Sequence, residues 1–230
     1  MIKNLKKIEK SIGVVFKNKK FLEQAFLHRS YLNENPGLKM KHNERLEFLG
    51  DAVLELSVTD YLFNHYPNPE GELTIWRASL VNSKILAEIA SQLGFNDHLL
   101  LSKGEHSDTG RARQFILANT FEAVVGAIYV DQGFKKADSF ILKSVVKELP
   151  RILKEKLYVD PKSFFQEQAQ SKAGTTPNYE LIKAEGPDHE KIFEVGVYLE
   201  DTLIAKGKGP SKQQAQEAAA KKALNKKNWN

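Results

Sequence analysis

The segment Asn43-Glu-Arg-Leu-Glu-Phe-Leu-Gly-Asp51 decides the fold, because it opens a helix that is expected to run to about His65. Glu44, Glu47 and Asp51 are spaced i, i+3 and i+7, so they share one stripe of this helix. The remaining positions are mostly apolar, which is typical of a helix that is largely buried. Buried like charges repel one another, and a divalent cation would offset that cost. The residues alone leave open a solvated acidic stripe and a metal site.

A second apolar helix is expected around residues 115–129, and it carries a single ionised side chain, Glu122. Asn119 lies about one turn earlier on the same face, and small residues such as Gly126 allow close packing with another helix. A buried carboxylate needs a partner. Arg45 or a backbone amide is one candidate, and a cation shared with the first helix is the other.

The composition limits the kind of protein and its chemistry. The 230 residues include 41% hydrophobic and 27% charged side chains, as in an ordinary globular protein. There is no cysteine, which excludes disulfides, thiolate zinc sites and a cysteine nucleophile. Without cysteine or paired histidines, clustered carboxylates suit Mg²⁺ or Mn²⁺ better than Zn²⁺. A net charge of +5 mildly favours a polyanionic partner. No apolar run is long enough for a membrane span or a signal core, so a cytoplasmic protein without a membrane partner is expected.

The chain changes character near residue 160. Residues 1–155 show helical spacing throughout, and residues 156–160 are predicted to link them to a second domain at 161–230. The second domain has an α-β-β-β-α pattern. Its helices are expected at 162–172 and 211–226, and its strands at 179–184, 193–199 and 203–206.

The segment Glu44–Asp51 resembles the signature motif of the bacterial ribonuclease III family. Further segments that resemble the family follow in the family's order, at residues 25–31, 77–81, 100–105, 110–113 and 121–123. The resemblance implies an all-α N-terminal endonuclease domain joined to a small α+β double-stranded-RNA-binding domain. It also implies a homodimer that hydrolyses double-stranded RNA with Mg²⁺, for which Mn²⁺ substitutes, and without an organic cofactor. Products with 5′-phosphate and 3′-hydroxyl ends are expected, from precursors of ribosomal RNA and from structured messenger and transfer RNA precursors.

The resemblance also assigns residues in the first domain. Asp51 and Glu122 are expected to be catalytic, and the implied metal ligands are Glu47, Asp51, Asn119 and Glu122. Glu44 and Glu70, the latter in a Pro-Glu-Gly loop, are auxiliary acidic positions. Phe48 corresponds to an aromatic residue that enters a pocket of the partner subunit, although from sequence alone an ordinary core Phe is an equal interpretation.

Asn119 departs from the family pattern, which usually has Asp there. Asn keeps an oxygen that can coordinate a cation but removes one negative charge, so a raised metal requirement is expected. The alternative is a catalytically weak or silent regulator that only binds double-stranded RNA. An unrelated helical phosphohydrolase acting on nucleotides is a remote second alternative, because it leaves the tail unexplained.

In the second domain three elements are expected to contact RNA. They are the helix face of Ser163, Gln166, Glu167 and Gln170, the turn containing His189, and the start of the last helix with Lys208, Ser211 and Lys212. Gln and Ser suit 2′-hydroxyl groups, and a helix N-terminus with lysines suits phosphate. A solvated helix face, a simple turn and a capped helix are the competing interpretations.

Overall fold

The computed structural model describes residues 4–107, 110–187 and 191–229. The chain forms two compact units, Met1–Tyr158 and Val159–Asn230. Each unit has a hydrophobic core of its own. The two units are therefore described separately.

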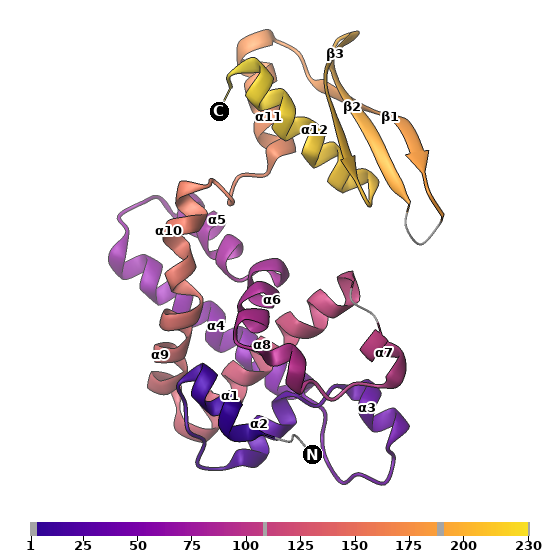
Figure 1. The fold of residues 1–230 in the computed structure, drawn as a ribbon. Helices are drawn as coiled ribbons and strands as arrows, with labels where there is room; N and C mark the ends of the chain where they lie inside the picture. The colour runs from indigo at the N-terminus through magenta and orange to yellow at the C-terminus, as the bar shows by residue number, and fades with distance from the viewer. Residues whose placement is uncertain (1–3, 108–109, 188–190, 230) are drawn as a thin grey trace. The chain divides into compact units, whose positions relative to one another are not determined.

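The regular elements in the described part of the first unit are helices (Figure 1), and one isolated parallel bridge joins Leu27 to Leu100. Its elements are α1 (Leu5–Ile12), α2 (Lys19–Ala25), α3 (Arg29–Glu34), α4 (Glu44–His65), α5 (Glu70–Leu80), α6 (Ser83–Gln92), η1 (Phe95–His98), α7 (Lys103–Ser107), α8 (Arg111–Gln132), α9 (Phe134–Ser144), η2 (Val146–Glu148) and α10 (Leu149–Lys154). The two helices predicted around the carboxylates correspond to α4 and α8.

The backbones of α4 and α8 touch where the helices cross. A Cβ atom added at Gly50 would lie 1.8 Å from the backbone oxygen of Glu122, and one added at Gly126 would lie 2.1 Å from that of Leu46. Only glycine, which has no Cβ, allows two helices to approach so closely. The predicted role of Gly126 in close packing is confirmed, whereas the matching role of Gly50 was not predicted.

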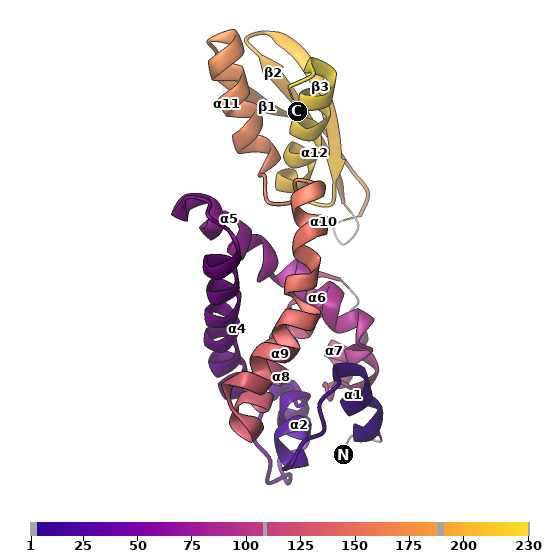
Figure 2. The ribbon, with the colours of Figure 1, turned by 90° about the vertical axis from the view of Figure 1, so that its left-hand side faces the viewer.

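The expectation that α4 is largely buried is wrong for one side of the helix. Leu54, Val58 and Leu62 are buried in the core, but Phe48 and Phe63 are 80% and 77% exposed. Leu56 is exposed on the same side. The interpretation of Phe48 as a core residue is therefore wrong. Figure 2 shows that α5 follows the end of α4. Glu70 is the first residue of α5, so it does not lie in the predicted loop.

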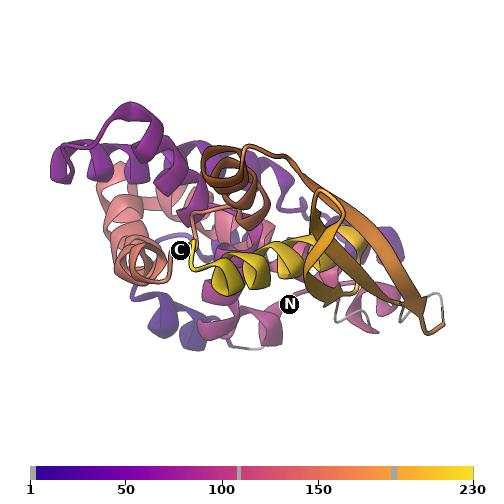
Figure 3. The same ribbon diagram turned by 90° about the horizontal axis from the view of Figure 1, so that it is seen from above.

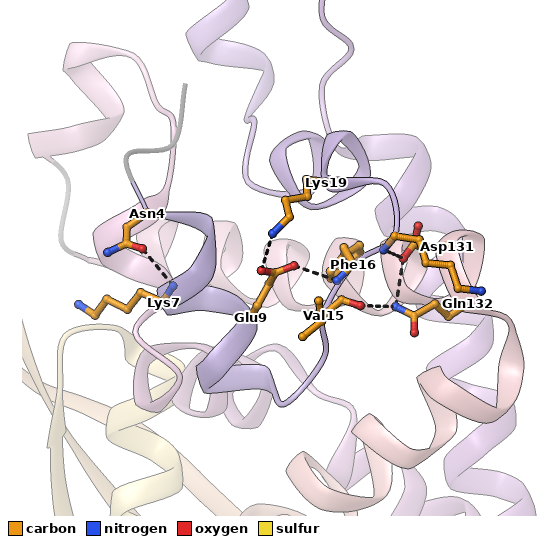
Figure 4. A network of polar contacts seen from close by, with 9 residues as sticks. Asn4, Lys7, Glu9, Val15, Phe16, Lys19, Asp131 and Gln132 are labelled. Atoms are coloured by element: carbon orange, nitrogen blue, oxygen red, sulfur yellow. Dashed lines mark hydrogen bonds and ion pairs between the residues drawn. The ribbon is translucent and has the colours of Figure 1, made fainter.

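Polar contacts fasten the N-terminal segment to the end of α8 (Figure 4). The buried carboxylate of Glu9 accepts hydrogen bonds from the backbone N–H of Phe16 and from Nζ of Lys19, both at 2.8 Å. The side chain of Gln132 donates to the backbone oxygen of Val15. Asp131 accepts two backbone N–H groups of the same segment, at 2.8 Å each. These bonds fix the C-terminal end of α8 and so support the crossing with α4.

The second unit is a three-stranded antiparallel sheet in the order β1-β2-β3, with two helices packed on it. Its elements are α11 (Pro161–Ala173), β1 (Pro177–Glu185), β2 (Ile192–Leu199), β3 (Thr202–Gly209) and α12 (Lys212–Lys227). Figure 3 shows α12 beside the strands and α11 next to it. The predicted α-β-β-β-α pattern is confirmed, although β3 continues to Gly209, three residues beyond its predicted end.

Glycines of β3 allow α12 to lie directly on the sheet. A Cβ atom at Gly207 would lie 2.2 Å from the backbone nitrogen of Ala219, and one at Gly209 would lie 2.8 Å from that of Ala215. Both alanines are fully buried. Small residues on both sides of the contact therefore explain why this strand is rich in glycine and this helix in alanine.

Candidate active site and nucleic-acid interface

The crossing of α4 and α8 brings their carboxylates together. Glu47 and Asp51 from α4 both act electrostatically on Glu122 from α8, and Asn119 is hydrogen-bonded to Glu47. The four side chains come from positions about 70 residues apart in the sequence. Their meeting follows from the close backbone contact at Gly50 and Gly126, because the carboxylates lie within one turn of these glycines.

Glu122 is a half-buried carboxylate that has no cationic partner among the described residues. Burial, together with the negative charges of Asp51 and Glu47, raises the pKa of Glu122 to about 8. Among the described residues, no lysine or arginine forms an ion pair with it, so the explanation by Arg45 is not supported. Within the described residues, the site therefore brings three carboxylates together without a basic side chain beside Glu122.

The raised pKa predicts how pH affects the stability of the metal-free protein. An unfolded Glu122 titrates near 4.5 and the folded one at about 8, so the folded state binds the proton more tightly. Stability should therefore fall by up to a few kcal/mol as pH rises from about 4.5 to about 8. Thermal melting with a chelator at pH 5.5, 7 and 8.5 measures this. The same slope in Glu122→Gln would contradict the assignment.

The amide of Asn119 supports the neighbouring carboxylate. Burial raises the pKa of Glu47, and the charges of Glu44 and Asp51 raise it further, whereas the hydrogen bond from Asn119 opposes these effects. An amide N–H donates to a carboxylate, which a second carboxylate at position 119 could not do when ionised. Asn119 therefore stabilises the ionised form of Glu47 before any cation is bound.

Glu44 stands at the edge of this cluster and not at its centre. Its side chain is 44% exposed and forms an ion pair with Arg29 at 3.3 Å. Nδ1 of His42 lies 3.7 Å from its other oxygen. Glu44 still raises the pKa of Glu47 by its charge. This position fits an auxiliary acidic residue whose charge is partly compensated within the chain.

The donor chemistry of the cluster fits a hard divalent cation. Three carboxylates and one amide oxygen are the ligand types that Mg²⁺ and Mn²⁺ prefer. In the described part of the chain, no three Asp, Glu or His side chains already surround a common point closely enough to hold an ion. The fit therefore rests on the ligand types and on the uncompensated charge around Glu122, and not on a finished cage.

Glu70 lies away from this cluster within one chain. It lines a cavity of about 550 Å³ at the far end of α4, together with Leu62, Phe63 and Arg77. Leu62 follows Asp51 by eleven residues of the same helix, which is a rise of roughly 16 Å. A single chain thus does not bring Glu70 to the other carboxylates.

The helix face predicted to contact RNA is solvent-exposed. Ser163, Gln166, Glu167 and Gln170 are all exposed on α11, opposite the buried Phe165. This exposure is required for an RNA contact but also suits a solvated face. His189 lies outside the described residues.

At the start of α12 the predicted cap is present in a modified form. Oγ of Ser211 accepts the backbone N–H of Gln214 at 3.2 Å and donates to that residue's side-chain oxygen at 3.3 Å. Lys212 is exposed. Lys208 belongs to β3, where its ammonium lies 3.5 Å from the carboxylate of Glu194 on β2. Lys208 is therefore partly compensated, which the sequence did not indicate.

A helical unit with a carboxylate cluster, followed by an α-β-β-β-α unit, defines a nuclease with a separate RNA-binding domain, and comparisons with known proteins agree. Residues 18–149 match the Ribonuclease-III-like family, and residues 161–227 match the double-stranded RNA binding motif. Ribonuclease 3 of a Nitratiruptor species is 44% identical over 97% of this chain and 96% of its own length. Ribonuclease 3 of Carboxydothermus hydrogenoformans is 45% identical over 96% of this chain and 94% of its own.

A solved structure agrees with the fold of the first unit. The nuclease domain of ribonuclease III from Campylobacter jejuni matches with a TM-score of 0.58 and 41% identity, covering 65% of this chain and 98% of that domain. The chain belongs to the ribonuclease III family. It is a ribonuclease III-type endoribonuclease with a double-stranded RNA binding motif. In the described part of the chain, none of the helices combines the length and apolar character needed to cross a membrane.

Proposed function

We propose that the chain cleaves double-stranded RNA by divalent-metal-dependent hydrolysis at the cluster of Glu47, Asp51, Asn119 and Glu122. The observation that carries the proposal is the convergence of these side chains at the α4–α8 crossing, where no described lysine or arginine forms an ion pair with Glu122. The oxygen atoms of these four residues would hold Mg²⁺ or Mn²⁺. When bound, such an ion lowers the pKa of a coordinated water and stabilises charge on the phosphate.

The chain's own residues position the substrate and control protons near the reacting phosphate. The Asp51 and Glu122 carboxylates lie on two different helices, so they can approach the phosphodiester from two sides. Attack by water at phosphorus breaks the bond to the 3′ oxygen, which takes up a proton. The expected products carry 5′-phosphate and 3′-hydroxyl ends. Ribosomal RNA precursors and structured messenger and transfer RNA precursors are the proposed substrates.

The experiment that tests this function uses the full-length chain and a labelled RNA duplex. Cleavage is expected with Mg²⁺ or Mn²⁺ and not with a chelator. End analysis should find 5′-phosphate and 3′-hydroxyl groups. Cleavage that continues with chelator, or that leaves a cyclic phosphate, would contradict the proposal.

We also propose a homodimer, in which the exposed side of α4 is the interface. Phe48, Leu56 and Phe63 are exposed within about 80° of one another on this helix. The cavity lined by Phe63 and Tyr66 is large enough for an aromatic side chain such as Phe48 from a second subunit. A structure of the Campylobacter jejuni nuclease domain describes flexibility in a region involved in dimer formation. The proposed role of Glu70 in the cleft requires this second subunit.

Replacement of Asn119 by Asp should change the metal requirement. The Asn119→Asp variant would have a charged carboxylate where the natural chain has a neutral amide. We expect this to lower the Mg²⁺ concentration for half-maximal cleavage by roughly tenfold. The metal-free variant should melt at a lower temperature, because the hydrogen bond to Glu47 is replaced by repulsion. Mg²⁺ titration of the cleavage rate and melting with chelator measure both effects. Identical metal dependence of the two proteins would refute the prediction. An inactive natural chain whose variant cleaves would favour the regulator that only binds RNA.

Lys212 should contribute more to RNA binding than Lys208. Lys212 is exposed at the helix N-terminus, whereas Lys208 is near Glu194. Lys212→Ala is expected to weaken duplex binding and to reduce the salt slope by about 1, and Lys208→Ala by less. Fluorescence anisotropy at several salt concentrations without divalent metal measures both. Lys143→Ala, an exposed lysine of α9 in the other unit, is the control. If both variants had the same salt slope of duplex binding as the control, these lysines would not be part of the RNA interface.

A further inference from the structure

Arg111 and Phe115 lie on the same side of α8 as the residues of the acidic cluster. Together with Asn119 and Glu122 they are spaced i, i+4, i+8 and i+11, within about 80° of one another around the helix. Asn119 and Glu122 are half-buried, Phe115 is 43% exposed and Arg111 is exposed. The stripe therefore runs from the proposed reaction centre outward to the surface.

Arg111 and Phe115 interact with each other. The guanidinium carbon of Arg111 lies 5.5 Å from the centre of the Phe115 ring, which is a cation–π contact. Among the described residues, no carboxylate forms an ion pair with Arg111. With respect to the described residues, its N–H donors are therefore held in place by the ring but remain available to an anion.

The exposure of Phe115 also needs an explanation. The next two residues of α8, Ile116 and Leu117, are 8% and 6% exposed, so the helix has a core side that Phe115 does not use. An aromatic ring left in water forgoes the free energy of burial. A ligand that covers the ring would recover part of it.

The distances along α8 suit a neighbouring part of the same substrate. Phe115 lies seven residues before Glu122 on α8, and Arg111 lies eleven residues before it. These separations correspond to rises of roughly 10 and 16 Å along the helix. Each nucleotide of a duplex strand advances roughly 3 Å. The pair is therefore a few nucleotides from a phosphate held at Glu122.

We propose that Arg111 and Phe115 form a positioning subsite for the RNA backbone beside the reaction centre. The guanidinium of Arg111 binds a phosphate, for which its planar donors are suited. The ring of Phe115 packs against the adjoining ribose, because the bases of an intact duplex stay stacked and are not open to it. The inference rests on the proposed placement of the reaction at Glu122.

The test compares full-length variants Arg111→Ala, Arg111→Lys and Phe115→Ala with Lys143→Ala as the control. Duplex affinity is measured at several salt concentrations without divalent metal, and kcat and KM are measured with Mg²⁺. Arg111→Ala should weaken binding roughly tenfold, as expected for one charge-assisted hydrogen bond, and reduce the salt slope by about 1. Its KM should rise more than its kcat falls.

The other variants separate the two contacts. Arg111→Lys should keep the salt slope and lose part of the affinity, because an ammonium keeps the charge but not the planar donors. Phe115→Ala should weaken binding with a smaller change of slope. The proposal would be overturned if these variants melted at a lower temperature but kept the RNA affinity and the salt slope of Lys143→Ala. In that case the pair would only stabilise α8.

Failure of this proposal differs from failure of the proposed function. If Glu122→Gln still cleaves RNA, the placement of the reaction is wrong, whatever Arg111 binds. If Glu122→Gln is inactive and all three variants match Lys143→Ala, the subsite alone is wrong.

Discussion

Glu122→Gln is expected to reduce cleavage of duplex RNA by more than about 10²-fold while leaving duplex affinity in the absence of divalent metal nearly unchanged. Changes to groups that merely support a metal ligand already cost roughly 10–100-fold, and Glu122 is proposed to be a ligand itself. The amide has nearly the same size as the carboxylate but removes the charge that Asp51 and Glu47 share with it.

The same variant should gain stability as it loses activity. At pH 8 the metal-free protein carries repelling charges at a half-buried site, and glutamine removes one of them. Thermal melting with chelator at this pH should therefore give a higher midpoint for Glu122→Gln than for the natural chain. This combination distinguishes loss of a functional group from simple unfolding.

Glu155→Gln is the matched control, because Glu155 is exposed at the end of α10 and has the same change of charge. It should cleave like the natural chain and melt at a similar temperature. If the Glu122 variant retains cleavage within a few-fold of this control, Glu122 is not part of the reaction centre.

Ala at Gly50 or Gly126 is expected to cost about 3 kcal/mol of stability or more and to abolish most activity. A Cβ at Gly50 would meet three backbone atoms of α8 within 2.8 Å, and backbone atoms cannot rotate away as a side chain can. The helices must separate, which opens the core around them. A shift of about 1 Å in the reacting groups can cost roughly 10²-fold in rate.

Gly71→Ala provides the control for these variants. Gly71 is also within a helix, α5, but an added Cβ there has no atom within 4 Å. Alanine should leave the chain as stable or up to about 1 kcal/mol more stable. Urea unfolding and cleavage rates measure all three proteins. Gly50→Ala with stability and activity like Gly71→Ala would show that the close crossing is not needed.

The two glycine predictions and the Glu122 prediction test different steps of one argument. The glycines determine how closely α4 and α8 can approach each other. The Glu122 variant tests whether the carboxylates brought together by this approach carry out the reaction. If the glycine variants fold but lose activity, the spacing of the helices matters chiefly for the site. If they do not fold, the crossing is first a part of the core.

The sequence by itself determined the features that depend on residues near each other in the chain. Three such features are the helical spacing from Glu44 to His65, the strand pattern of the tail and the cap at Ser211. Each involves neighbours within about four residues, so the amino-acid sequence alone is enough to predict it. The eight-residue motif and its ordered companions likewise identified the family correctly, because such a resemblance needs no coordinates.

Only the tertiary structure decided which of those residues meet. That Phe48 is exposed, that Glu70 lies at the far end of α4 and that Lys208 faces Glu194 all depend on how separate elements pack. The same holds for the meeting of Asn119 with Glu47. The contact of Asn119 with Glu47 joins residues about 70 positions apart and depends on the crossing of two helices, whereas the ion pair of Lys208 with Glu194 depends on the register of two strands. A local periodicity carries no information about either.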